Sequence, residues 1–259
     1  MKLFDPVPPR TIPPNLVTAT AMSFGMVSIY TSLSGGDLQR AAWFVLISVL
    51  LDKLDGSVAR ALKGSTEFGV QMDSFADNVA FGMAPAALIF RAAHDLTPAT
   101  WGDSALIAGI SAPSVLGAIC LFYALMTTVR LARFNVMTAT LGPEIFLGLP
   151  STLSGGMLTT LFLSIYQVGV DKTWPQVFAF FPLLLLVNAF LMVSNLPLPK
   201  AKLSKHKILM PIQATLALVV YVLVLTRTWL WLVLLLVVAY LAVGFLFLGP
   251  RMWSASRRD

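Results

Sequence analysis

The sequence predicts an all-α, polytopic membrane protein with about eight transmembrane helices, and composition and hydrophobic pattern carry this prediction. Of the 259 residues, 57% are hydrophobic and only 12% are charged, which is about half the charged share of soluble domains. The mean hydropathy is +0.81. The apolar residues gather in runs of about 20, the length that a helix needs to cross a bilayer. No soluble domain of useful size fits between these runs.

Eight apolar runs meet the length requirement, and polar or helix-breaking residues separate them. They cover approximately residues 16–33, 41–62, 70–91, 105–129, 153–170, 176–195, 208–226 and 229–248. Pro13 and Pro14 precede the first run, and proline is well tolerated at the start of a helix. The segment SLSGGD joins the first two runs, and LPLPKAKLSKHK joins the sixth and seventh. We therefore expect eight spans joined by short loops.

Basic residues predict the orientation, because they accumulate on the cytoplasmic side of membrane proteins. With both termini in the cytoplasm, the outer side carries only Arg40, Arg91, Lys172 and Arg227. The inner side then carries Lys2, Arg10, Lys63, Lys200, Lys202, Lys205, Lys207, Arg251, Arg257 and Arg258, with Arg60, Arg130 and Arg133 at inner helix ends. The net charge of +6 is expected to face anionic lipid headgroups rather than nucleic acid.

Four aspartates lie in and beside the second and third runs, which are otherwise almost free of acidic residues. They are Asp52, Asp55, Asp73 and Asp77. Carboxylates at membrane depth are costly unless something compensates them. Spacings of three and four residues place each pair on one face of its helix. Because the connection between the two spans is short, we expect all four carboxylates to converge just inside the cytoplasmic interface.

A cluster of carboxylates indicates a site for hard divalent cations. Ligation by oxygen alone favours Mg²⁺, Mn²⁺ or Ca²⁺. Four carboxylates are enough to hold two ions a few ångströms apart, and such a pair can clamp a phosphoryl group. The single Cys120 and the two histidines, His94 and His206, offer no ligand set for zinc, since the histidines are expected near opposite membrane faces.

Small and basic residues beside the acids suit an anionic, flat ligand. Gly56 and Ala59 follow Asp55, where small side chains would let a base or a pyrophosphate approach the backbone. Arg60 offers a planar fork of donors for phosphate oxygens. Gly69 opens the third span, where free backbone N–H groups favour an anion.

These residues form the pattern Asp52-x-x-Asp55-Gly56-x-x-Ala59-Arg60, eight further residues, then Gly69-x-x-x-Asp73-x-x-x-Asp77. The pattern resembles the signature of the CDP-alcohol phosphotransferases at every fixed position. The resemblance implies an integral membrane enzyme with a six-helix core, which moves a phosphate-linked group from a CDP-activated donor to an alcohol and releases CMP. It implies a catalytic core over residues 1–200, and two additional helices with a basic tail over residues 201–259.

The resemblance also implies a role for each residue of the pattern. The metal ligands would be Asp52, Asp55, Asp73 and Asp77, around one or two Mg²⁺ or Mn²⁺ ions. Asp77 would also act as the general base. The CDP and its pyrophosphate would be bound by Gly56, Ala59, Arg60 and Gly69. The active site would face the cytoplasm.

Five further stretches resemble the membrane-embedded phosphatidylserine synthases of this family. They are PNLVTATAMSFG (14–25), MDSFADNVAFGMAPA (72–86), RLARFNV (130–136), FLGLPSTLSGG (146–156) and LMVSNLP (191–197). This resemblance implies CDP-diacylglycerol and L-serine as substrates and a two-metal mechanism with direct attack on phosphorus. Arg130 and Arg133 would hold the acceptor or anchor a helix end, and Asn135 would bind the acceptor or end the helix.

Three alternatives stay open at this point. The same reaction could use glycerol 3-phosphate or an inositol phosphate as acceptor. The acidic cluster could instead serve an ion or solute transporter, since membrane carboxylates often do. The stripe of Ala76, Ala80 and Ala84 predicts close packing against another helix, and that helix could belong to the same chain or to a homodimer partner.

Overall fold

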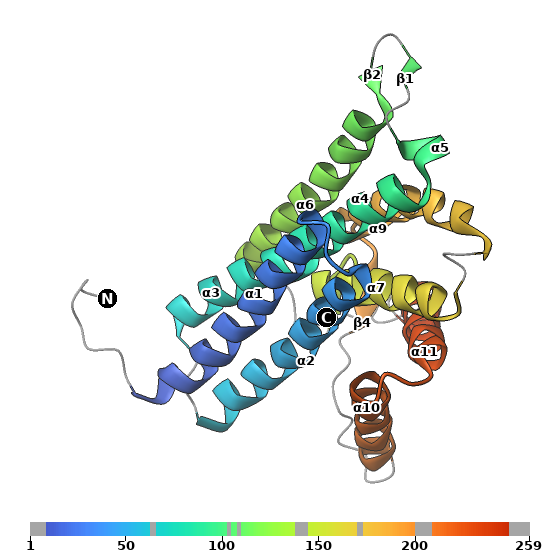
Figure 1. The fold of residues 1–259 in the computed structure, drawn as a ribbon. Helices are drawn as coiled ribbons and strands as arrows, with labels where there is room; N and C mark the ends of the chain where they lie inside the picture. The colour runs from blue at the N-terminus through green and yellow to red at the C-terminus, as the bar shows by residue number, and fades with distance from the viewer. Residues whose placement is uncertain are drawn as a thin grey trace.

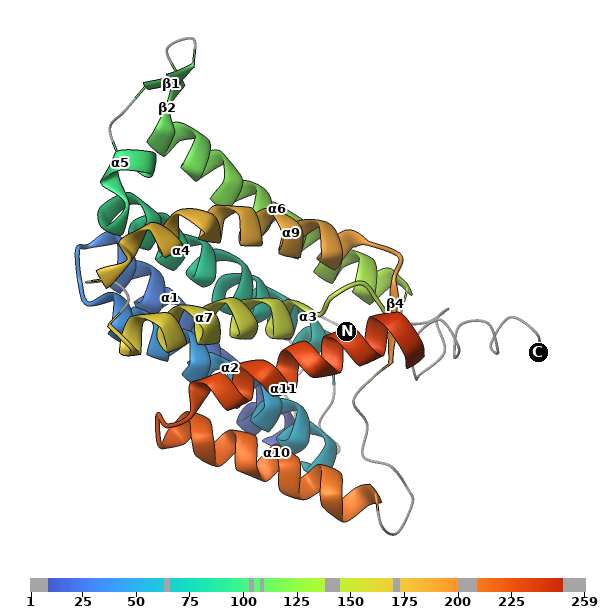
Figure 2. The same ribbon diagram turned by 90° about the vertical axis from the view of Figure 1, so that its right-hand side faces the viewer.

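A computed structural model of the protein describes residues 9–62, 66–102, 105–107, 110–137, 145–169, 173–199 and 209–248. The described chain is a bundle of long helices with two short antiparallel ribbons (Figure 1). Figure 2 shows α10 and α11 on one side of this bundle, where α11 packs along α7.

Helices occupy all eight predicted positions, which confirms the all-α fold class. They are α1 (Ile12–Leu33), α2 (Leu38–Leu62), the continuous rod of α3 (Glu67–Asp77), η2 (Asn78–Met83) and α4 (Ala84–Leu96), then α6 (Ala112–Met137), α7 (Ser151–Gln167), η3 (Pro175–Phe180) with α9 (Phe181–Val193), α10 (Leu209–Leu225), and α11 (Leu230–Val243) with η4 (Gly244–Leu248). Short helical turns are η1 (Pro9–Thr11) and α5 (Pro98–Trp101). Among the described helices, three are long and apolar enough to cross a membrane by length and composition: α1, α6 and Pro175–Val193.

The fourth span differs from its prediction at both ends. Residues 105–129 were expected to be helical, but β1 (Ala105–Ile107) and β2 (Ile110–Ser111) form a small hairpin before α6 begins. Pro113 lies in the first turn of α6, where its missing N–H costs no helical hydrogen bond. The sequence from 130 to 137 contains no glycine or proline, so the helix continues for two more turns. Arg130 and Arg133 therefore lie inside α6 rather than at its end.

A second ribbon pairs the segment directly before α7 with the segment that follows α9. Strand β3 (Ile145–Leu147) pairs antiparallel with β4 (Pro197–Pro199), which follows α9. Gly148 comes directly after β3 with a φ of +75°, a conformation that favours glycine. Its N–H donates to the carbonyl of Leu196 at 2.8 Å, and the N–H of Leu149 donates to that of Leu191 at 3.0 Å. The entry to α7 is thereby fixed to the end of α9.

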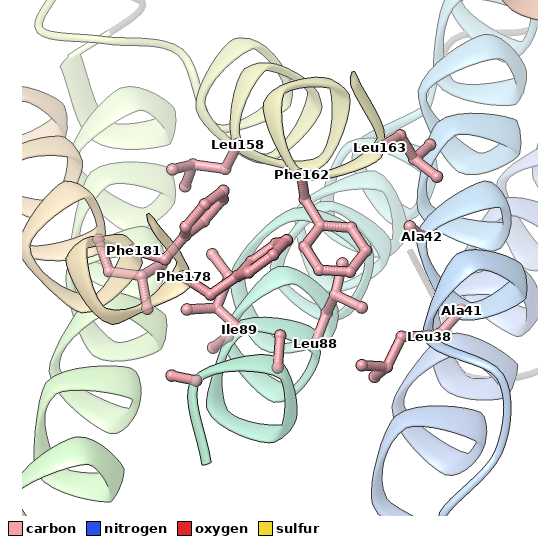
Figure 3. Close-up of a cluster of buried hydrophobic side chains, with 14 of the residues drawn as sticks. Leu38, Ala41, Ala42, Leu88, Ile89, Leu158, Phe162, Leu163, Phe178 and Phe181 are labelled. Carbon is pink, nitrogen blue, oxygen red and sulfur yellow. The ribbon is translucent and has the colours of Figure 1, made fainter. Parts of the chain in front are cut away.

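Large apolar side chains from several helices pack together inside the bundle (Figure 3). Phe162 of α7 meets Phe178 edge-on at 5.6 Å between ring centroids, and Phe178 stacks on Phe181 at 5.5 Å. Leu88 and Ile89 of α4 point into the same cluster (Figure 3). This core fixes how α4, α7 and α9 pack, and thereby how the helices that carry the site are arranged.

The π-helical segment η2 is held between two neighbouring helices by small residues. A Cβ on Gly25 of α1 would lie 2.8 Å from the Cα of Ala80, and one on Gly155 of α7 would lie 2.9 Å from the Cα of Phe81. The hydroxyl of Tyr123 also donates to the carbonyl oxygen of Phe81 at 3.0 Å. Helices α1 and α7 thus approach the backbone of η2 as closely as glycine allows.

The predicted close packing of the alanine stripe is confirmed. Ala76, Ala80 and Ala84 are all buried, and Ala80 meets Gly25 of the same chain. In the described residues, the stripe is therefore covered from within the protein, and the structure gives no support to a homodimer contact there.

We expect Gly155→Ala to lower the free energy of unfolding by about 1–3 kcal/mol, the usual cost of overpacking a tight contact. The new Cβ would lie 2.9 Å from the backbone of Phe81, which cannot give way as a side chain can. The neighbouring Gly156→Ala is the matched control, because its Cβ would lie 3.4 Å from a methyl group of Val49. Thermal unfolding in detergent should separate the two variants, and equal melting temperatures would contradict the close contact.

Candidate active site

The structure brings three of the four predicted aspartates into one cluster. Carboxylate oxygens of Asp52 and Asp55 from α2 and of Asp73 from α3 all lie within 4.8 Å of one another. Asp77 lies one turn further along the rod, is buried, and interacts electrostatically with Asp52 and Asp73. The convergence that the spacing predicts is thus observed, with Asp77 on the buried side of the cluster.

Hydroxyl groups from two other helices hold individual carboxylate oxygens. Thr18 of α1 donates to Oδ2 of Asp55 at 2.8 Å. At the start of α7, Ser151 donates to Oδ2 of Asp77 at 3.0 Å. The adjacent Thr152 reaches Oδ2 of Asp52 at 3.5 Å, which is a long and weaker contact.

The aspartate cluster fits a hard divalent cation. Its ligand atoms are carboxylate oxygens only, the donor type that Mg²⁺ and Mn²⁺ prefer. Two oxygens bound across one Mg²⁺ lie about 4.2 Å apart, twice the Mg–O distance. The observed upper limit of 4.8 Å is close to this value, so small side-chain adjustments would complete the coordination.

A pocket of about 120 Å³ opens beside the cluster, between α1, α2 and α3. Three of the four residues predicted to bind CDP line it, Gly56, Ala59 and Gly69, together with Asp55 and Asp73. Ligand pockets usually measure about 300–1,000 Å³. This pocket is therefore large enough for only part of a CDP-linked lipid, and the remainder would extend beyond it.

Arg60 does not line the pocket but lies over its edge. Its side chain is exposed and donates from Nη2 to Ser57 at 3.3 Å. Its Nη1 lies 3.4 Å from where a Cβ on Gly56 would stand. The glycine thus leaves room for the guanidinium to lie along α2, from where its remaining donors can reach a phosphate.

The prediction that Gly69 offers a free backbone donor is wrong. Helix α3 begins at Glu67 with Thr66 as its N-cap, and the N–H of Gly69 donates to the Thr66 hydroxyl at 3.1 Å. A Cβ on Gly69 would lie 3.2 Å from Oδ1 of Asn15. Glycine is needed here for space, because both α1 and the N-cap approach it closely.

Sequence reasoning missed Asn15, Thr18 and Thr66 as residues of the site. All three line the pocket. Thr66 had a local signal, since a threonine directly before a helix is a preferred N-cap. The only signal for Asn15 and Thr18 was their place in the stretch PNLVTATAMSFG (14–25), because the packing of α1 against α2 and α3 is what brings them to the aspartates.

Arg130 and Asn135 reach the same region from α6. Arg130 is 8% exposed, donates from Nη1 to Ser151 at 3.1 Å, and lies over the ring of Phe134 at 5.2 Å. Asn135 donates to the hydroxyl of Ser74 at 2.9 Å, directly beside Asp73 in the sequence. Two of the three predicted acceptor residues are therefore close to the aspartates.

The contacts of Arg133 match the second of its two predicted roles, the anchoring of a helix end. Its Nη1 donates to the carbonyl of Val193 at 2.7 Å, and its Nη2 to Oδ1 of Asn195 at 2.6 Å. The last carbonyl groups of a helix have no hydrogen-bond partner within the helix. A cationic side chain that donates to them satisfies these carbonyls and complements the helix dipole. These contacts give Arg133 a structural role that joins α6 to the end of α9.

Residues 11–194 match the family model described as CDP-alcohol phosphatidyltransferase. The chain therefore belongs to this family of membrane-embedded transferases of phospholipid synthesis, which depend on divalent metal ions. Because the members of this family are enzymes, the alternative that the acidic cluster serves an ion or solute transporter is rejected.

Curated relatives are similar over most of the chain. A CDP-diacylglycerol–serine O-phosphatidyltransferase of Helicobacter pylori is 31% identical over 205 residues, which cover 78% of each chain. An archaetidylserine synthase of Methanothermobacter thermautotrophicus is 31% identical over 190 residues, 72% of this chain and 69% of the relative. A CDP-diacylglycerol–serine O-phosphatidyltransferase of Bacillus subtilis is 28% identical over 198 residues, 74% of this chain and 92% of the relative.

We expect Arg133→Lys to lower the melting temperature while the KM for the alcohol acceptor stays unchanged. The variant keeps the charge but loses the fork that bonds Val193 and Asn195, and each lost hydrogen bond costs about 1 kcal/mol. Arg40→Lys, at an exposed pair with Asp37, is the matched control and should change neither quantity. An increased KM at an unchanged melting temperature would instead assign Arg133 to the acceptor.

Proposed function

We propose that the protein transfers the phosphatidyl group of CDP-diacylglycerol to L-serine, which gives phosphatidylserine and CMP. The observation that carries this proposal is the cluster of Asp52, Asp55 and Asp73 beside a pocket lined by Gly56 and Ala59. The names of the curated relatives all contain serine, whereas the lipid in those names differs. They therefore support serine as the acceptor more strongly than a particular lipid.

Asp52, Asp55 and Asp73 would hold a divalent cation, Mg²⁺ or Mn²⁺, and Asp77 would complete a two-ion site. Cations held by these carboxylates would supply positive charge for the pyrophosphate of the donor and for the departing oxygen of CMP. The carboxylates are fixed by hydroxyls from α1 and α7, so little reorganisation is needed when the donor arrives.

The donor would bind with its pyrophosphate in the pocket and its acyl chains in the bilayer. Gly56 and Ala59 leave the backbone of α2 accessible, and Arg60 lies at the edge for a phosphate oxygen. Leu16, Phe68 and Val70 near the pocket are exposed. Apolar side chains at this opening suit the acyl chains of a lipid that enters sideways from the membrane.

The acceptor would attack phosphorus directly, with Asp77 taking the proton of its hydroxyl. No covalent intermediate with the enzyme forms in this scheme, so the configuration at phosphorus inverts. Arg130 and Asn135 lie near Asp77 and Asp73, and Arg130 is suited to a carboxylate such as that of serine.

The proposed topology places the active site and both termini in the cytoplasm, as the basic residues favour. Residues 1–200 would form the catalytic core, and residues 201–259 would add two helices and a tail. The added helices contact the core through Tyr221, whose hydroxyl donates to the carbonyl of Leu50 at 2.9 Å. They are therefore expected to support the core rather than to form a separate module.

The acceptor is tested by supplying the purified protein with CDP-diacylglycerol, Mn²⁺ and a panel of radiolabelled alcohols. We expect CMP release and labelled phosphatidylserine with L-serine, and far less product with glycerol 3-phosphate or an inositol phosphate. Each of these two acceptors carries a dianionic phosphate, which would need more than one basic side chain to balance its charge. Among the described residues, the buried cation near Asp77 is Arg130. Product from either phosphate acceptor at a rate above that with serine would replace serine in this proposal.

We expect Asp73→Asn and Asp77→Asn each to lower kcat by at least about 100-fold, the lower range for loss of an acid–base group. Asp73→Asn should also weaken Mn²⁺ binding, because it removes a charged ligand. Asp77→Asn should largely retain binding of CDP-diacylglycerol. Asp37→Asn, at the exposed start of α2, is the matched control. Turnover of purified Asp77→Asn near the wild-type rate would show that another group is the base.

A further inference from the structure

The first residue of α7 lies between an arginine and an aspartate that come from two other helices. Ser151 is completely buried. Nη1 of Arg130 lies 3.1 Å from its hydroxyl oxygen, and that hydroxyl lies 3.0 Å from Oδ2 of Asp77. Arg130 and Asp77 are themselves buried, at 8% and 9% exposure.

The chemistry of the three groups determines the direction of both hydrogen bonds. A guanidinium can only donate, and an ionised carboxylate can only accept. With Asp77 ionised, the single proton of Ser151 points to Oδ2 of Asp77, while its oxygen accepts from Arg130. Both bonds involve a charged partner, which makes them stronger than bonds between neutral groups, and their burial adds to this effect.

We propose that Ser151 is a positioning residue for Asp77. Its hydroxyl holds Oδ2 in place and thereby orients the carboxylate of Asp77 for a metal ion or for the proton of the acceptor, and it links the carboxylate to the charge of Arg130. This inference rests on the proposed function, and it adds to the proposed contact of Arg130 with the acceptor a link from Nη1 of Arg130 through Ser151 to Asp77.

The backbone before Ser151 is fixed in a way that suits this role. Gly148 has a positive φ, and a Cβ there would clash with the carbonyl oxygen of Met192. This close approach of the two backbones, together with the hydrogen bonds from 148 and 149 to the end of α9, determines where α7 begins. A serine at that point has little freedom to move away from Asp77.

The test compares Ser151→Ala with Ser154→Ala in the full-length protein in detergent. Ser154 lies one turn further along α7, is equally buried, and bonds Tyr123 and Asn188 rather than a carboxylate. Mn²⁺ alone is the probe, with binding measured by electron paramagnetic resonance in the absence of lipid. We expect Ser151→Ala to weaken Mn²⁺ binding by about tenfold or more, the usual effect of removing a group that orients a ligand. Ser154→Ala should leave the affinity unchanged.

Kinetic constants provide a second measurement on the same two variants. Ser151→Ala should lower kcat about tenfold or more with an unchanged KM for L-serine, because it acts on Asp77 rather than on the acceptor. A raised KM with unchanged Mn²⁺ affinity would make Ser151 an acceptor-binding residue and overturn the proposal. Equal behaviour of both alanine variants would reduce Ser151 to a packing role and also overturn it.

A double-mutant cycle tests whether the effect passes through Asp77. In an Asp77→Asn background, the added change Ser151→Ala should cause no further loss of Mn²⁺ affinity, since coupled residues are not additive. Additive losses would contradict the proposal. Ser151→Cys keeps a side chain of similar shape with a weak donor, so it should give an intermediate affinity and serves as the test if the alanine variant does not fold.

The outcomes also separate this inference from the proposed function. If the wild-type protein binds Mn²⁺ but forms no product with serine, the proposed function fails, while the comparison of Mn²⁺ affinities still decides the role of Ser151. If the wild-type protein binds no Mn²⁺, both the metal site and the positioning role are overturned.

Discussion

The mutual repulsion of carboxylates at membrane depth is the constraint on which this structure depends. At the 4.8 Å limit of the cluster, two like charges repel by roughly 3 kcal/mol at an effective dielectric constant of 20. A hydrogen bond to a charged group stabilises the folded protein by about 1.5–3 kcal/mol. The hydroxyls of Thr18 and Thr152 and the ion pair of Lys53 with Asp52 at 3.3 Å offset part of the repulsion among Asp52, Asp55 and Asp73, and the cluster still holds more negative than positive charge. The described arrangement therefore favours a bound cation.

Close approach between helices is what brings the hydroxyl of Ser151 to its carboxylate. Ser151 and Gly155 are one turn apart on α7, and Asp77 and Phe81 are one turn apart on the rod. Ser151 meets Asp77, and Gly155 meets the backbone of Phe81. The two contacts share one parallel register, so the missing side chain at Gly155 also determines the hydrogen bond one turn earlier.

The sequence predicted those features that depend on local spacing. Intervals of three and four residues placed the aspartates correctly, because a helix repeats every 3.6 residues. Features that depend on tertiary contacts were not predictable in this way. Thr18 reaches Asp55 across 37 positions of sequence, and the end of α9 takes up the donors of Arg133. The predicted start of the fourth span was wrong, because an apolar run alone does not distinguish a helix from a short hairpin.

The two C-terminal helices contact the parts of the core that support the aspartates. Tyr221 of α10 donates to the carbonyl of Leu50, two residues before Asp52. Tyr240 of α11 donates to the carbonyl of Pro199 at 2.6 Å, in the strand that pairs with β3 directly before the entry to α7. Helix α11 also packs along α7. The two added helices therefore contact both α2, which carries Asp52 and Asp55, and α7, whose first residue holds Asp77. They are physically continuous with the site, although the residues that would carry out the chemistry all lie before them in the chain.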